Sequence, residues 1–280
     1  MAKIGIVGYG YVGKAVEYGF KDKHQIFIHD KFLPSQPLDQ VVKHSDFIFV
    51  SVPTPMDSKY RQIDLSIVNQ VVKDIIHLAR KLKVHPVVVI KSTVIPGTTR
   101  QLAKKYRWPR ILFNPEFLTE ANYLEDFVNA DRVVVGGDSN EIRHKLIMLY
   151  REAFPKTLMF ETDPVTAELV KYMSNTYLAT KVIFANEMAQ LCEKLGIKYE
   201  EVKKMVVADR RIYDSHLDMT TQKGFGGKCF PKDTVALLGL AKDLGIDLSV
   251  LTTVWKKNLK IRNVRDWEDI PGAVSKSRKH

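Results

Sequence analysis

The sequence contains little cysteine, with only Cys192 and Cys229 among its 280 residues. Two thiols cannot build the disulfide framework of a small secreted domain, so we expect a reducing compartment and interpret Cys192, in an apolar helical stretch, as a core residue. The sequence also lacks any apolar run near the ~18 residues of a membrane span, and its first strand-like run begins at residue 3, which leaves no room for a signal peptide. It therefore predicts a cytoplasmic protein without a membrane segment.

Signatures of nucleic-acid binding are missing as well, although the formal net charge is +11. This excess of basic residues calls for an anionic partner. Lysine and arginine gather in residues 255–280, but this segment contains no zinc-finger, RRM or homeodomain pattern. We therefore interpret it as a solvated face or loose end, and we expect neither a nucleic-acid partner nor a metal site.

What the sequence does contain is a regular alternation of strand-like and helical patterns, with no internal repeat. A hydrophobic content of 45% is enough for a real core in one large domain or two ordinary ones. Alternating strands and helices predict a Rossmann-like, doubly wound parallel sheet, an α/β fold. The expected strands cover residues 3–7, 25–29, 47–50, 87–90, 111–113, 132–135 and 157–160, and the expected helices cover 12–20, 64–83, 98–106 and 140–153.

A glycine motif follows the first expected strand directly and opens a helix. Gly8 permits the tight turn, Gly10 lets a pyrophosphate approach the backbone, and Gly13 lets the helix pack on the strand. Tyr11 and Val12 lie between these glycines at the helix N-terminus, where phosphates bind. Strand, turn and helix in this order predict a dinucleotide-binding site.

The second expected strand ends in an acidic residue, Asp30, about 20 positions further on. A carboxylate there holds the adenosine ribose hydroxyls and repels a 2′-phosphate, which favours NAD over NADP. Lys31 beside it weakens the exclusion of NADP. We predict NAD as the cofactor, with both residues in its site.

A second glycine-rich segment, residues 224–233, surrounds one thiol with basic and acidic side chains. Lys228 and Lys232 would favour the thiolate of Cys229, the form that attacks carbonyls. Asp233 would lie one helical turn from the thiol if the intervening proline opens a helix. A buried cysteine in a glycine-rich turn is the alternative. Together with a nicotinamide site, the segment suggests aldehyde oxidation through a thiohemiacetal and a thioester.

A long helix is expected from Asp163, its N-cap, to about residue 195, with Pro164 in its first turn and Gly196 after its end. It is far longer than a typical globular helix, so we expect it to bridge two domains. Lys171 and Asn175 share one of its faces. The predicted division is an NAD-binding domain at residues 1–162, a central helical domain at 163–265 and a polar basic tail at 266–280.

Motifs across most of the chain resemble those of the UDP-glucose/GDP-mannose dehydrogenase family. Besides the glycine turn and the cysteine segment, they are residues 51–55 (SVPTP), 91–98 (KSTVIPGT), 114–120 (NPEFLTE), 167–171 (AELVK) with Asn175, and 209–212 (DRRI). The resemblance implies an NAD-dependent four-electron oxidation of a nucleotide sugar at C6, with UDP-glucose giving UDP-glucuronate as the leading expectation.

The resemblance also implies a role for each matching residue. Cys229 would be the nucleophile, Lys171 and Asn175 would hold the oxyanion, Asp233 with Thr93 and a water would act as the base, and Glu116 would assist thioester hydrolysis. Cofactor contacts would come from Thr54, Thr93, Glu120 and Lys232. Substrate contacts would come from Glu116, Phe117, Leu118, Glu120, Lys171, Asn175, Arg211, Phe225 and Gly226.

Assembly is a further implication of the resemblance. Arg211 matches an arginine that reaches the sugar of a neighbouring subunit, which together with the long helix implies a homodimer. Members of the family continue into a second Rossmann-like domain that contacts the uridine, and this chain stops after residue 265 and a short tail. We therefore expect weak substrate binding, a separate chain that completes the pocket, or a different substrate.

Two alternative functions remain open. One is a truncated NAD-binding subunit or sensor without activity of its own. The other is a two-electron dehydrogenase of the hydroxyacid or 6-phosphogluconate type, which would leave Cys229 and its loop unexplained.

Overall fold

The computed structural model describes residues 1–57, 59 and 62–275, which divide into two units. The first unit consists of Met1–Thr54 and Asp64–Lys171, and the second of the described residues of Pro55–Ile63 and Tyr172–His280. Within the described part, no helix combines the length and the apolar character that a membrane crossing requires.

The first unit is built on one sheet, in which seven described strands follow the order β2-β1-β3-β4-β5-β6-β7. The chain runs outward from β1 to β2 on one side and to β3 on the other, so the strand order reverses between β1 and β3, where ligands of doubly wound sheets bind. The strands are β1 (Lys3–Val7), β2 (Gln25–His29), β3 (Phe47–Val50), β4 (Val87–Ile90), β5 (Ile111–Phe113), β6 (Arg132–Gly136) and β7 (Leu158–Thr162).

One strand pairing differs from the predicted all-parallel sheet. β5 and β6 pair antiparallel through Phe113 and Gly136, while β6 and β7 are parallel to each other. The connection from β5 to β6 contains only a six-residue helix, α5 (Tyr123–Val128). At about 1.5 Å per residue this helix is about 9 Å long, too short to return along the sheet as a crossover helix does.

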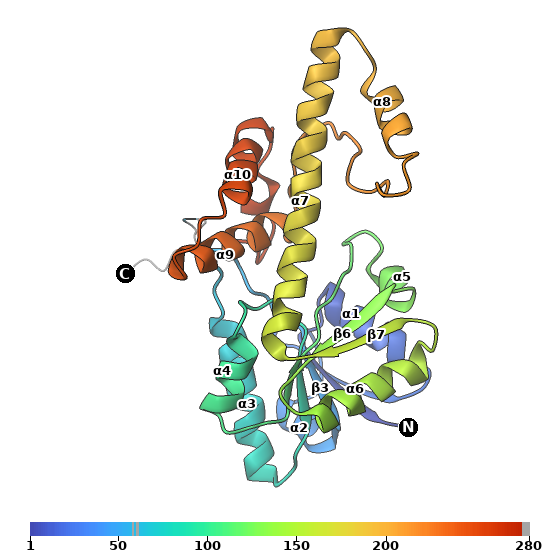
Figure 1. Cartoon of the computed structure of the whole chain (residues 1–280). Helices are drawn as coiled ribbons and strands as arrows, with labels where there is room; N and C mark the ends of the chain where they lie inside the picture. The colour runs from blue at the N-terminus through green and yellow to red at the C-terminus, as the bar shows by residue number, and fades with distance from the viewer. Residues whose placement is uncertain (58, 60–61, 276–280) are drawn as a thin grey trace. The chain divides into compact units, whose positions relative to one another are not determined.

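Helices cover both faces of this sheet (Figure 1). Successive strand residues point to opposite faces, so Phe47 and Phe49 pack against α1 (Tyr11–Phe20), α5 and α6 (Asn140–Ala153), whereas Ile48 and Val50 pack on the other face. The helices of that second face are α2 (Leu38–His44), α3 (Ser66–Leu82) and α4 (Thr98–Lys105).

The second unit is helical. It contains most of α7 (Pro164–Leu195), with α8 (Tyr199–Val206), α9 (Phe230–Asp243), α10 (Ser249–Ile261) and the 3-10 helix η1 (Asp266–Glu268). The predicted ends of α7 are confirmed, because Pro164 is its first residue and Gly196 follows its end with a φ of +69°. The unit boundary, between Lys171 and Tyr172, falls inside this helix rather than before it at residue 163.

Residues 266–275, predicted as the start of a polar basic tail, contribute Trp267 and Ala273 to the core of the second unit. The Trp267 side chain is fully buried and packs on Trp255, with ring centroids 5.8 Å apart. The backbone amide of Met56 donates to the Ala273 carbonyl at 2.8 Å. Residues 266–275 themselves contain no lysine or arginine. The basic residues of the predicted tail, Lys276, Arg278 and Lys279, lie outside the described residues.

Candidate functional site

The glycine turn after β1 has the geometry of a dinucleotide site. A Cβ atom at Gly8, where φ is +92°, would lie 2.6 Å from the Ser51 carbonyl oxygen, and one at Gly13 would lie 2.2 Å from the Gly8 oxygen. A Cβ at Gly10 would meet nothing within 4 Å. Packing inside the protein thus requires glycine at the first and third positions, whereas the second leaves space for a pyrophosphate at the N-terminus of α1.

Asp30 lies directly after β2 and contacts this turn. Its carboxylate accepts hydrogen bonds from the Tyr9 amide at 2.8 Å and from the Phe32 and Leu33 amides at 2.8 and 3.2 Å. Burial on its own would raise the pKa of Asp30, but these three amides stabilise the charged form and hold the pKa below its usual value. The carboxylate is therefore ionised at neutral pH, while Lys31 beside it is exposed.

The loops after β3 and β4 lie next to each other because the two strands pair in parallel. The Ser92 hydroxyl accepts from the Val52 amide at 2.9 Å and donates to the Val52 carbonyl at 2.7 Å. Thr54 and Thr93, the predicted cofactor contacts of these loops, are both buried within the first unit.

Lys171 and Glu116 form a buried ion pair in the first unit. The Lys171 Nζ lies 2.8 Å from the Glu116 Oε1 and also donates to the Glu116 carbonyl oxygen at 2.8 Å. The two side chains are only 3% and 10% exposed. Burial would raise the pKa of Glu116, yet the Lys171 ammonium and the amide of Leu118 outweigh it and lower the pKa. Two residues that were predicted to act at separate steps are thus direct partners.

Lys91 is a second buried lysine, close enough to Glu116 and Lys171 to interact with their charges. No role was predicted for it from the sequence. Its Nζ donates to the Asn114 Oδ1 at 2.9 Å and to the Asn114 carbonyl at 3.2 Å. Complete burial lowers the pKa of Lys91 to about 7, although the Glu116 carboxylate opposes the shift. A lysine directly after four buried strand residues was the signal in the sequence that could have identified it.

The first unit contains a pocket of about 280 Å³. Lys91 and Asn114 line it together with the predicted substrate-binding residues Glu116, Phe117 and Leu118. The guanidinium of Arg132, also in the lining, lies 4.1 Å from the centre of the Phe117 ring. Glu120, the remaining predicted residue of this loop, is exposed.

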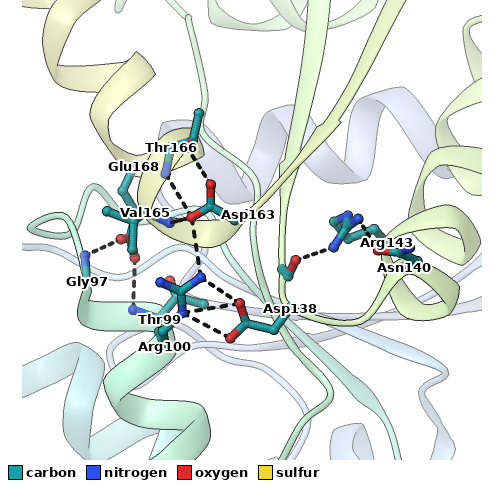
Figure 2. A network of polar contacts seen from close by, with 11 residues as sticks. Gly97, Thr99, Arg100, Asp138, Asn140, Arg143, Asp163, Val165, Thr166 and Glu168 are labelled. Atoms are coloured by element: carbon teal, nitrogen blue, oxygen red, sulfur yellow. Dashed lines mark hydrogen bonds and ion pairs between the residues drawn. The ribbon is translucent and has the colours of Figure 1, made fainter.

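A polar network fixes the first turns of α7, which carry Lys171 (Figure 2). The Asp163 carboxylate caps the helix by accepting from the amides of Val165 and Thr166 at 2.9 and 3.3 Å. One turn further, the buried Glu168 carboxylate accepts from the amides of Gly97 and Thr99 at the start of α4. Burial raises the pKa of Glu168 to about 7, against these hydrogen bonds.

In the second unit, Cys229 is the residue immediately before α9, as predicted from Pro231. The Asp233 amide donates to the Cys229 carbonyl at 2.9 Å, which places the carboxylate one turn from the thiol. Asp233 is fully buried and accepts from the Asn175 Nδ2 at 2.6 Å. Lys232 also forms an ion pair with Asp233.

Three predicted substrate contacts, Phe225, Gly226 and Arg211, lie in the second unit. The Phe225 side chain is 3% exposed and lies in the core of the second unit, 6.1 Å from Trp255 between ring centroids, because an apolar ring is more stable there. A Cβ at Gly226 would lie 2.2 Å from Arg262 and Asp266 side-chain atoms. Arg211 is exposed and pairs with Asp209 of its own chain.

The predicted catalytic residues are divided between the units. Thr93, Glu116 and Lys171 belong to the first, and Asn175, Cys229 and Asp233 to the second. Both Lys171 and Asn175 are residues of α7.

Comparisons with known proteins match both units to one family. Residues 17–154 match the NAD binding domain of the UDP-glucose/GDP-mannose dehydrogenase family, and residues 165–260 match its central domain. The glycine turn and Asp30 fit this assignment of the first unit to NAD.

Among curated relatives, a protein of Rickettsia prowazekii named UDP-glucose 6-dehydrogenase is 35% identical over 89% of this chain and 62% of its own length. The Bacillus subtilis UDP-glucose 6-dehydrogenase TuaD is also 35% identical, over 88% of this chain and 52% of its own. A solved structure of a UDP-glucose dehydrogenase from Pyrobaculum islandicum aligns with a TM-score of 0.85 at 29% identity, over 93% of this chain and 68% of that one. The chain thus spans roughly half to two thirds of the curated relatives' length.

Proposed function

Because the chain belongs to the UDP-glucose/GDP-mannose dehydrogenase family, we propose that it catalyses the four-electron oxidation of UDP-glucose to UDP-glucuronate. The proposed substrate is that of two relatives at 35% identity, both of which are UDP-glucose 6-dehydrogenases by name. The reaction converts the C6 alcohol and one water into a carboxylate, with loss of two hydrides and three protons. Bound NAD supplies the hydride acceptor in each of the two oxidations.

The observation that carries this proposal is the arrangement around Cys229. The thiol precedes α9, so the positive end of the helix favours its anionic form. One turn further along α9 the buried carboxylate of Asp233 is held by the amide of Asn175. A half-buried thiol, with a buried carboxylate and an amide donor one helical turn away, supplies the groups that covalent aldehyde oxidation requires.

In the proposed reaction, Asp233 removes the proton of the C6 hydroxyl with the help of Thr93 and a water, and C6 loses its first hydride, which leaves an aldehyde. The Cys229 thiolate then attacks the resulting aldehyde carbon and forms a thiohemiacetal. Loss of the second hydride leaves a thioester. Lys171 and Asn175 stabilise the negative charge on the sugar oxygen, because an ammonium and an amide fixed in a buried site need little reorganisation.

Glu116 is proposed to activate the water that hydrolyses the thioester. Its lowered pKa keeps it ionised at neutral pH, which is the form that accepts a proton. Attack by water releases the carboxylate and restores the Cys229 thiol, so the protein is unchanged after each turnover.

The test is the ratio of NADH formed to nucleotide sugar consumed, measured with the 280-residue chain and a panel of nucleotide sugars. The proposal predicts two NADH for each UDP-glucose. A ratio of one would support the two-electron alternative, and NAD binding without turnover on any sugar would support the non-enzymatic one.

We further propose a homodimer through α7. In the second unit five apolar side chains of this helix, Met173, Tyr177, Phe184, Leu191 and Leu195, are each more than half exposed. At about 100° per residue they fall within about 40° of one another around the helix axis. An apolar stripe of this length is unfavourable in water, and a second copy of the same helix would cover it.

Phe184→Glu should convert the dimer to a monomer, because a carboxylate buried in the centre of an apolar interface is costly. Light scattering after size exclusion should give 32.0 kDa for this variant and twice that value for the unmodified chain. Phe32→Glu is the matched control, since Phe32 is 86% exposed in the first unit. A Phe184→Glu variant that keeps the unmodified chain's dimeric mass would exclude this interface.

A further inference from the structure

The glycine segment before Cys229, residues 223–227, is held by side chains that lie 30 to 40 residues away in the sequence. The side chain of Asn258, on α10, is fully buried. Its Oδ1 accepts from the Phe225 amide at 2.7 Å and its Nδ2 donates to the Phe225 carbonyl at 3.0 Å. On the other side the Asn186 Oδ1 accepts from the Gly224 amide at 3.2 Å. The Gly224 amide and both backbone groups of Phe225 thus each have a side-chain partner.

An ion pair secures the two ends of the same segment. Arg262 Nη1 donates to the Lys223 carbonyl at 3.0 Å, and Asp266 Oδ2 accepts from the Gly227 amide at 3.1 Å. The two side chains meet each other at 3.0 Å between Arg262 Nη2 and Asp266 Oδ1. The Arg262 side chain is 7% exposed and the Asp266 side chain 30%, so salt screens this pair less than a fully exposed one.

The glycines of the segment match these side chains in shape. A Cβ at Gly224, where φ is +53°, would lie 2.3 Å from the Asn258 Oδ1, and one at Gly226 would lie 2.2 Å from the Arg262 and Asp266 atoms. A Cβ at Gly227 would meet nothing within 4 Å. The absence of a side chain at Gly224 and Gly226 therefore leaves space for Asn258, Arg262 and Asp266.

The segment that supplies Asp266 is itself fixed. Trp267, the next residue, is fully buried against Trp255 of α10. Asp266 is therefore restrained in two ways: its neighbour Trp267 is buried in the core, and its carboxylate is paired with Arg262.

We propose that Asn258, Arg262 and Asp266 are positioning residues that hold the thiol of Cys229 at the N-terminus of α9. They act through the backbone of residues 223–227, which ends two residues before the thiol. Glycines lose more conformational freedom on ordering than any other residue, so such a segment needs fixed partners to keep one conformation. The proposal deepens the proposed function, on which it rests, by naming what keeps the nucleophile in its reactive position.

Arg262→Met should lower the kcat of acid formation on the order of 10²-fold, the effect of a misplacement of about 1 Å at a reacting group. The KM for NAD should not change, because the glycine turn belongs to the other unit. Arg262→Lys, which keeps the charge next to Asp266, should recover part of the loss. Lys257→Met is the control, since Lys257 is also a cation of α10 but pairs with Glu187, outside the glycine segment.

Alkylation of the two cysteines by iodoacetamide separates positioning from general stability. At pH 10 an ordinary thiol is deprotonated, so the rate reports access to the sulfur. In Arg262→Met the rate at Cys229 should rise several-fold, while Cys192, buried in the same unit, should stay protected. Asp266→Asn should show the same pattern more weakly, since its amide oxygen still accepts from Gly227.

Two results would overturn the inference. One is an Arg262→Met variant with unchanged kcat and unchanged alkylation of Cys229. The other is equal exposure of both cysteines in Arg262→Met and Asp266→Asn, which would give the ion pair a role in the stability of the whole unit. If the unmodified chain forms no acid at all, the proposed function fails, and the alkylation rates still decide whether the pair positions Cys229.

Discussion

Cys229→Ala should abolish the formation of UDP-glucuronate, with a loss of about 10⁴–10⁶-fold, the range that removal of a nucleophile produces in other covalent enzymes. Alanine leaves nothing to capture the aldehyde, so the reaction should stop before the second oxidation. NAD binding should be unchanged, because the glycine turn and Asp30 belong to the other unit. NADH progress curves and assay of the acid product measure both expectations.

Cys192→Ala is the matched control for this prediction. Cys192 is the second thiol of the same unit and is buried in α7, so its loss removes a core contact without touching the proposed chemistry. Acid formation should persist in this variant. Acid formation at an unchanged rate in Cys229→Ala would instead show that no covalent step through this thiol takes place.

Lys171→Met should destabilise the first unit by about 3–5 kcal/mol, because it leaves the Glu116 carboxylate buried without its partner. The side chains are 3% and 10% exposed, so water can compensate little of this cost. Lys171→Met combined with Glu116→Gln should restore most of the stability, since no unpaired charge then remains. Hydrogen exchange of the β4 and β5 peptides across a urea series would measure the first unit alone.

The Lys171–Glu116 pair predicts that the stability of the unmodified chain and that of Lys171→Met depend on pH in opposite directions. In the unmodified chain the pKa of Glu116 is lower in the folded state than its unfolded value of 4.5, so its stabilising contribution is present above pH 4.5 and is lost as the pH falls through the folded pKa. In Lys171→Met burial would dominate and raise this pKa, so the variant should gain stability as the pH is lowered toward 4.5. Parallel pH dependences for the two proteins would contradict the ion pair.

Most of the fold could be predicted because local sequence patterns determine where its helices and strands begin and end. The helix Asn140–Ala153 and the long helix with Asp163 and Gly196 at its ends occur where the sequence predicts them. The direction of β6 and β7 could not be predicted, since a buried strand has the same apolar pattern in either direction. The direction depends on the length of the helix α5 between β5 and β6, which is seen only in the folded structure.

Single site residues could be predicted where they belong to a sequence motif. Their interaction partners could not be predicted where those lie in distant segments of the chain. Lys171 and Glu116 were each identified, but their pairing depends on the packing of α7 against the loop after β5. Asn258 occupies an apolar position of α10, three and four residues after Trp255 and Val254, and a polar residue there was the available signal. Composition alone placed Arg262 and Asp266 in a solvated segment, because the buried Trp267 beside them has no local pattern.

The central claim, a thioester on Cys229, is tested most directly by the mass of the peptide that contains it. The unmodified chain is mixed with NAD and UDP-glucose, quenched in acid during turnover and digested, with Cys192 as the internal reference. We predict an acyl adduct of the sugar nucleotide on the Cys229 peptide, absent from the Cys192 peptide and from samples without NAD. Rapid acid formation with Cys229 unmodified, together with full activity of Cys229→Ala, would contradict the account.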